Sequence, residues 1–164
     1  MYTITTKKPE QTQQFAAKIL TKLTARPRNG ALILALAGDL GAGKTTFVQG
    51  LAQELGITEP ITSPTFILAN TYDISSSDKQ RKLTHIDCYR FESAANAEIL
   101  PFTEMFQDQE HLICIEWPEK IQELLPKDTV WIGFEYGKKE NERIIKISHG
   151  VILAQAGIQT SFKY

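Results

Sequence analysis

The chain has 164 residues, 42% of them hydrophobic, which suffices for one α/β domain with a full core but excludes two domains of ordinary size. Its formal net charge of −1 gives no electrostatic basis for autonomous nucleic-acid binding, so any role near RNA is expected to be indirect or shared with a partner. No apolar run approaches the roughly 20 residues that cross a membrane, and the first residues are not signal-like, which predicts a cytoplasmic protein.

The first predicted elements are an edge strand and an amphipathic helix. Residues 2–6 alternate weakly between polar and apolar side chains, which is typical of a short strand. Pro9 suits the first turn of a helix, and the apolar stripe that follows predicts a helix that ends before Pro27. Gln11 and Thr12 lie near its start. They are either contacts to a base or ribose or, as composition alone favours, solvated helix-start residues.

A phosphate-binding sequence follows the next predicted strand. Residues 31–37 are an apolar run of the length expected for a strand buried on both faces. Residues 38–45, GDLGAGKT, fit the pattern G-x-x-x-x-G-K-[ST], and apolar side chains then recur at helical spacing until Gly56, which suits a helix end. This strand, turn and helix are the context that a phosphate-binding loop requires, and we favour it over a glycine turn that binds nothing.

The residue types in this loop match the chemistry of a polyphosphate. Glycines allow successive backbone N–H groups to turn towards an anion, and the start of the helix adds further donors. Lys44 supplies a mobile positive charge for the β- and γ-phosphates, and Thr45 offers a hydroxyl to Mg²⁺, which prefers oxygen ligands. The loop therefore predicts a site for a nucleoside triphosphate with Mg²⁺.

The segment after the second helix presents a threonine in a loop. Ser63 precedes Pro64 and is biased towards an extended conformation, so Thr65 is expected at the start of a strand that runs from Phe66 to about Tyr72. Two interpretations of Thr65 stay open. It senses the γ-phosphate or the metal, as switch loops do, or it belongs to an ordinary turn.

The next predicted strand, over 82–90, carries polar side chains. It is expected to pair with the preceding strand as a hairpin. A period of two then places His85, Asp87 and Tyr89 on one face. Beside a nucleotide site, this row of polar side chains favours a chemical role. Elsewhere, His85 would be a hydrogen-bonded neutral histidine and Asp87 would cap the end of the strand.

A second carboxylate is predicted at the end of a buried strand. The apolar run over 111–117 carries Glu116 near its end, and ligands gather beyond the carboxyl ends of parallel strands. Glu116 is therefore the better match to a Walker B acid, and Asp87 is the second candidate. Burying either carboxylate is costly without a cation or hydrogen-bond donors, which favours Mg²⁺ nearby.

The remaining segments complete one domain. They are two short helices over 92–106, a short helix over 118–125, and a hairpin of strands 130–136 and 142–148. Residues 150–164 show no clear period, so we expect a domain over 1–149 followed by a weakly anchored tail. Cys88 and Cys114 lack C-x-x-C spacing and are most simply reduced core residues. The pattern predicts a P-loop NTPase-like three-layer αβα domain of the α/β class, with a mixed sheet of parallel core and antiparallel hairpins.

Four motifs in this order closely resemble the bacterial TsaE family, formerly YjeE. They are GDLGAGKTT at 38–46, SPTF at 63–66, HIDCYR at 85–90 and EWP at 116–118, and the resemblance spans about 10–148. It implies a P-loop ATPase needed for N6-threonylcarbamoyladenosine at position 37 of tRNAs that read codons starting with A. It also implies the partners TsaD and TsaB, while TsaC makes the threonylcarbamoyl adenylate that they consume. Contact with tRNA is expected only indirectly or with these partners.

The resemblance also implies roles for individual residues. The ATP-binding loop falls on Leu40, Gly41, Ala42, Gly43, Lys44, Thr45 and Thr46. The Mg²⁺ ligands fall on Thr45 and Glu116, and Asp87 is the essential acid of the H-x-D-x-Y-R motif and a further candidate ligand. Additional nucleotide contacts fall near the start of the first helix, around Gln11 or Thr12, and in the final hairpin, near Arg143.

These assignments give a mechanism and two rivals. Mg²⁺ on Thr45 and Glu116, together with Lys44, is expected to neutralise charge on the γ-phosphate while Asp87 orients water or the ion, so Lys44, Asp87 and Glu116 are the predicted catalytic residues. Hydrolysis is expected to be slow alone and faster with the partner complex. One rival is a P-loop small-molecule or nucleotide kinase with Asp87 as base, which would need an arginine-bearing lid. The other is a nucleotide-gated binding module in which turnover is incidental.

Overall fold

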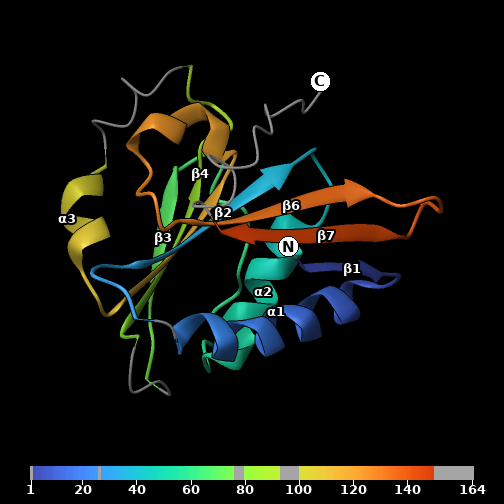
Figure 1. The fold of residues 1–164 in the computed structure, drawn as a ribbon, viewed down its shortest axis with the longest axis horizontal. Helices are drawn as coiled ribbons and strands as arrows, with labels where there is room; N and C mark the ends of the chain where they lie inside the picture. Colours follow the sequence, from blue (N-terminus) through green and yellow to red (C-terminus); the bar gives the residue numbers. More distant parts are fainter. Residues whose placement is uncertain (1, 26, 76–79, 93–99, 150–164) are drawn as a thin grey trace.

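The computed structural model of the chain describes residues 2–25, 27–75, 80–92 and 100–149, which form one seven-stranded sheet with helices on both faces (Figure 1). In chain order the elements are β1 (Tyr2–Thr6), α1 (Pro9–Thr24), β2 (Leu32–Gly38), α2 (Lys44–Glu54), β3 (Ala69–Asp73), β4 (Lys82–Asp87), α3 (Phe102–Gln107), β5 (His111–Glu116), the 3₁₀-helix η2 (Pro118–Leu124), β6 (Val130–Tyr136) and β7 (Arg143–His149).

The sheet combines a parallel centre with antiparallel margins. Its strand order is β1-β7-β6-β2-β5-β4-β3. Strands β4, β5, β2 and β6 are parallel to one another, whereas β3, β7 and the edge strand β1 pair antiparallel with their neighbours. The carboxyl ends of the four parallel strands therefore lie at the same edge of the sheet, where a ligand site is expected.

Two apolar clusters on opposite faces of the sheet produce the three layers. One lies against α1 and α2 and includes Leu34 of β2 and Phe47 of α2. The other lies on the opposite face and includes Ile33 of β2, Phe102 of α3 and Ile121 of η2. Alternate residues of β2 thus enter different clusters, as expected for a strand buried on both faces. The structure confirms the predicted α/β class and its three-layer αβα architecture.

Helices α1 and α2 pack closely against each other at Gly50. A Cβ atom at this position would lie 2.4 Å from both the Cα and the carbonyl oxygen of Gln13. We therefore expect Gly50→Ala to lower the free energy of unfolding by about 1–3 kcal/mol, the usual cost of overpacking, as measured by urea denaturation. Gly133→Ala is the matched control, because the nearest atom to its added carbon is 4.0 Å away. Equal losses in the two variants would contradict this close approach.

The predicted strand that begins at Phe66 is wrong at its start. Strand β3 begins only at Ala69, and residues 65–67 form a turn. The N–H groups of Ile67 and Leu68 donate to the Pro64 carbonyl at 2.9 and 2.7 Å, which curls the chain before it can extend. The hairpin of β3 and β4 that was expected next is confirmed.

The predicted strand over 82–90 also ends early, at Asp87. The Asp87 carboxylate accepts the Tyr89 N–H at 2.9 Å, and this local bond turns the chain. Tyr89 therefore does not share the strand face of His85 and Asp87, contrary to the prediction. Asp87 pairs in register with Glu116 on β5, so the two acids are neighbours at the carboxyl edge of the sheet.

Other predicted segments have mixed outcomes. The helix expected over 118–125 is the 3₁₀-helix η2. Of the two helices expected over 92–106, the second is α3. Residues 93–99 and the tail 150–164 lie outside the described residues. Cys88 and Cys114 are buried free thiols, and burial raises the pKa of Cys88 to about 12. In the ranges that the structure describes, no helix is long and apolar enough to span a membrane.

Candidate nucleotide-binding site

The loop between β2 and α2 has the backbone of an anion-binding turn. Gly41 and Gly43 have φ values of 74° and 102°, which L side chains rarely adopt. The Ala42 N–H donates to the Asp39 carbonyl at 3.2 Å, and the Phe47 N–H donates to Gly43 at 3.0 Å in the first turn of α2. No side chain caps α2, so its N-terminal donors face the loop without competition from a capping group.

Lys44 lies inside this loop. Its side chain is buried, with 3% exposed, and its Nζ donates to the carbonyl oxygens of Gly38 and Asp39 at 2.7 and 2.8 Å. The ammonium also lies 4.4 Å from the centroid of the Trp117 ring. Burial lowers the pKa of Lys44, and the nearby Glu116 carboxylate opposes this shift. A cation held by two neutral carbonyls is available to an anionic ligand that enters the loop.

Two side chains from different elements converge on one carboxylate oxygen of Glu116, at the end of β5. The Thr45 hydroxyl of α2 donates to Glu116 Oε1 at 2.7 Å, and His85 Nε2 of β4 donates to the same oxygen at 2.9 Å. Both His85 and Glu116 are buried. Hydroxyl and carboxylate oxygens are the ligands that Mg²⁺ prefers, and this ion usually keeps several waters. Within the described residues no three His, Cys, Asp or Glu side chains form a metal cluster.

Asp87 is beside Glu116 but is bonded to a different segment. Its Oδ2 accepts hydrogen bonds from Ser63 Oγ and Thr65 Oγ1, each at 2.5 Å, and its Oδ1 accepts the Tyr89 N–H. The carboxylate is 3% exposed, and these three donors compensate its burial. Asp87 therefore ties the Ser63–Thr65 loop to the carboxyl edge of the sheet.

The β6–β7 hairpin makes hydrogen bonds with the phosphate-binding loop. The Tyr136 hydroxyl donates to the Leu40 carbonyl at 2.6 Å, and Arg143 donates through Nε and Nη2 to the Gly41 carbonyl at 3.3 and 3.2 Å. The Arg143 guanidinium lies 4.5 Å from the centroid of the Tyr136 ring. These bonds hold the Leu40 and Gly41 carbonyls against the β6–β7 hairpin.

A cavity of about 480 Å³ adjoins the loop. Its lining combines the start of α1 (Lys8, Pro9, Thr12), the loop and α2 (Gly41, Gly43, Thr46) and the β6–β7 hairpin (Glu140, Asn141, Arg143). Because this cavity adjoins the loop, it is the candidate place for the base and ribose of a nucleotide.

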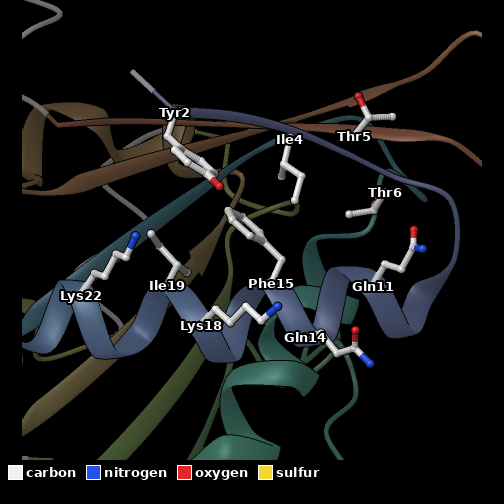
Figure 2. Close-up of a pocket in the computed structure, with 10 residues that line it drawn as sticks. All are labelled: Tyr2, Ile4, Thr5, Thr6, Gln11, Gln14, Phe15, Lys18, Ile19 and Lys22. Carbon is white, nitrogen blue, oxygen red and sulfur yellow. The ribbon is translucent and has the colours of Figure 1, made fainter.

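The structure separates the two candidates near the start of α1. Thr12 lines this cavity, and its hydroxyl is 2.8 Å from that of Thr6. Gln11 instead accepts the Lys7 N–H at 2.7 Å and lines a separate cavity of about 580 Å³ between β1 and α1 (Figure 2). Thr12 is thus the better placed of the two for nucleotide contact.

Two residues of this site were missed by the sequence analysis. Tyr136 ends β6, which pairs parallel with β2, so its position beside the loop follows from the rule that parallel strands end at one edge. Ser63 donates to Asp87 across 24 residues, and no local pattern indicates that contact.

The strand order, the loop after β2 and the acids at the ends of β4 and β5 define a P-loop NTPase-like αβα domain. A family model described as threonylcarbamoyl adenosine biosynthesis protein TsaE matches residues 6–145. The chain therefore belongs to the TsaE family.

Individual relatives and a solved structure agree with this assignment. The tRNA threonylcarbamoyladenosine biosynthesis protein TsaE of Bacillus subtilis is 41% identical over 76% of this chain and 71% of its own. The protein of the same name from Haemophilus influenzae is 33% identical over 73% of this chain and 71% of its own. The crystal structure of YdiB from Bacillus subtilis aligns with a TM-score of 0.68 at 30% identity and covers 94% of this chain and 92% of that one.

Proposed function

We propose that this protein binds and slowly hydrolyses Mg·ATP in support of N6-threonylcarbamoyladenosine formation at position 37 of tRNAs reading A-starting codons. It would act in the cytoplasm with the TsaD–TsaB complex, which would contact the tRNA. The names of its relatives support the pathway. The observation that carries the ATPase assignment is the bond from Thr45 to Glu116 directly beside the buried Lys44.

Each residue has a defined task in this proposal. Lys44 moves from the loop carbonyls to a phosphate oxygen and, with the loop N–H groups, balances the charge that develops on the γ-phosphate. Thr45 and Glu116 would hold Mg²⁺, which would supply positive charge against the phosphate groups. Asp87, already an acceptor for two hydroxyl groups, orients the attacking water.

Two measurements test this proposal. Inorganic phosphate release from ATP should depend on Mg²⁺ and should rise when TsaD–TsaB is added. Depletion of the protein from cells should remove the modified nucleoside from tRNA, as measured by mass spectrometry of digested tRNA. Normal modification after depletion would overturn the role in this pathway even if the ATPase activity were found.

A P-loop kinase is the alternative that shares most of this chemistry. It would use Asp87 as a base towards an acceptor hydroxyl and would close an arginine-bearing lid over the nucleotide. Within the residues that the structure describes, the helix after β5 is only the short η2, and no helical lid is present. Phosphate released to water supports the ATPase, whereas phosphate transferred to an added acceptor supports the kinase.

A binding module that needs ATP but not its hydrolysis is the second alternative. It predicts that a variant that binds ATP without turning it over still supports modification in cells. Complete loss of the modified nucleoside in such a variant would exclude it.

His85 is expected to strengthen Mg²⁺ binding through its hydrogen bond to Glu116. His85→Ala removes the second donor to Glu116 Oε1, and loss of such a supporting partner typically costs about 10–100-fold in metal affinity or activity. We expect the Mg²⁺ concentration that gives half-maximal phosphate release to rise by this factor. His111→Ala is the control, because His111 is also buried but contacts Thr84 instead. A similar rise in both variants would indicate a general loss of folding.

A further inference from the structure

Two large apolar side chains project into solvent immediately after Thr65. Phe66 is 85% exposed, the highest fraction among the large hydrophobic side chains that the structure describes, and its neighbour Ile67 is 63% exposed. Adjacent exposed apolar side chains of this size are unfavourable in water and mark sites of interaction. Phe66 directly follows Thr65, whose hydroxyl is bonded to Asp87 of the candidate nucleotide site.

A hydrogen-bonded turn holds Phe66 and Ile67 in solvent. The Pro64 carbonyl accepts the N–H groups of Ile67 and Leu68, and Leu68 has a φ of 69°, which is costly for a side chain with a Cβ. The Asp87 N–H donates to the Leu68 carbonyl at 2.9 Å and fixes the end of the turn on β4. The turn thus holds Leu68 in a strained conformation, while Phe66 and Ile67 stay out of the core.

A cation accompanies the apolar pair. The Arg90 guanidinium lies 4.6 Å from the centroid of the Phe66 ring, and Arg90 is itself exposed. Phe66, Ile67 and Arg90, named here the Phe66 surface, therefore present an apolar protrusion with a positive charge beside it. The complementary face is an apolar pocket with carboxylates at its rim.

The Phe66 surface is connected to the nucleotide site by direct bonds. Ser63 and Thr65, on the near side of the turn, both donate to Asp87 Oδ2. Asp87 is paired in register with Glu116, the acid bonded to Thr45. Any change in the partners of Asp87 when a ligand binds would therefore move the first residues of the turn and the pair that follows them.

We propose that the Phe66 surface docks a protein partner through an apolar pocket rimmed by carboxylates, and that this partner thereby contacts the turn bonded to Asp87. This inference rests on the proposed function, which makes the TsaD–TsaB complex the partner to test. The expected partner is a protein, because one aromatic ring and one aliphatic side chain next to a single cation match an interface anchor.

The test measures two affinities for the full-length chain. Binding to purified TsaD–TsaB is measured by biolayer interferometry with Mg²⁺ and a non-hydrolysable ATP analogue, and binding to a fluorescent ATP analogue is measured without partners. The double variant Phe66→Ala, Ile67→Ala should bind the complex at least about 100-fold more weakly, as expected for the loss of two anchors, while its nucleotide affinity stays within about twofold. Arg90→Glu should weaken complex binding further than Arg90→Gln.

Tyr2→Ala is the matched control. Tyr2 is 52% exposed on β1, at the opposite edge of the sheet from β3, and its removal should leave both affinities unchanged. Parental affinity of the double variant for TsaD–TsaB would overturn the inference and leave the proposed function standing. A parent chain that binds neither nucleotide nor TsaD–TsaB would overturn both. Binding of tRNA alone that is lost in the double variant would assign the Phe66 surface to RNA and overturn the protein partner.

Discussion

Lys44→Met is expected to lose ATP binding and turnover without losing stability. The substitution removes the ammonium that would balance the phosphate charge, and loss of one such group typically lowers turnover by about 10²–10³-fold. Phosphate release and titration with a fluorescent ATP analogue measure these effects.

The stability of this variant has a defined dependence on pH. Because burial lowers the pKa of Lys44, the charged form is less favourable in the folded than in the unfolded chain. The nucleotide-free variant should therefore unfold at the same or a higher urea concentration than the parent at neutral pH. The difference should shrink as the pH rises through the lowered pKa towards 10.5, because the parent then loses its buried charge. A variant that is much less stable than the parent would contradict this account of Lys44.

Glu116→Gln is expected to separate nucleotide binding from hydrolysis. The amide oxygen can still accept hydrogen bonds from Thr45 and His85, so the fold and the loop should persist. The negative charge that would hold Mg²⁺ is lost, and we expect turnover to fall by about 100-fold, a loss of roughly 2.7 kcal/mol of transition-state stabilisation. Nucleotide affinity measured without Mg²⁺ should change little.

Glu119→Gln is the control for this charge effect. Glu119 is a half-buried acid close enough to Lys44 to interact with its charge, but burial raises its pKa, and the Thr45 hydroxyl donates to Glu116 instead. Its replacement should leave turnover within about twofold of the parent. Equal losses in the two variants would show that general electrostatics near Lys44, and not a ligand role of Glu116, controls the rate.

The strand, loop and helix around Lys44 were predictable because each has a local cause. The run 31–37 is apolar on both faces, the loop needs glycine at positive φ, and Gly56 indeed has a φ of 72° after α2. Glu116 was predictable because parallel strands end at one edge of the sheet, and the register of β4 and β5 confirms that it lies beside Asp87.

The partners of Asp87 were not predictable from local pattern. Asp87 was expected to share a face with Tyr89, but its carboxylate bonds the Tyr89 N–H and two hydroxyl groups about 22 to 24 residues earlier in the chain. The turn at Phe66 escaped prediction for a different, local reason, because the Pro64 carbonyl accepts the N–H groups of Ile67 and Leu68, which an extended strand would leave to a neighbour. The two long-range bonds of Asp87 depend on three-dimensional neighbours that the two-residue period of a strand does not encode.

Isothermal titration of the full-length protein with ATP, in the presence of Mg²⁺ and again with EDTA, tests the central claim most directly. The arrangement of Lys44, Thr45 and Glu116 predicts one binding site per chain whose affinity falls when Mg²⁺ is removed. Absence of binding under both conditions, or an affinity that Mg²⁺ does not change, would contradict it.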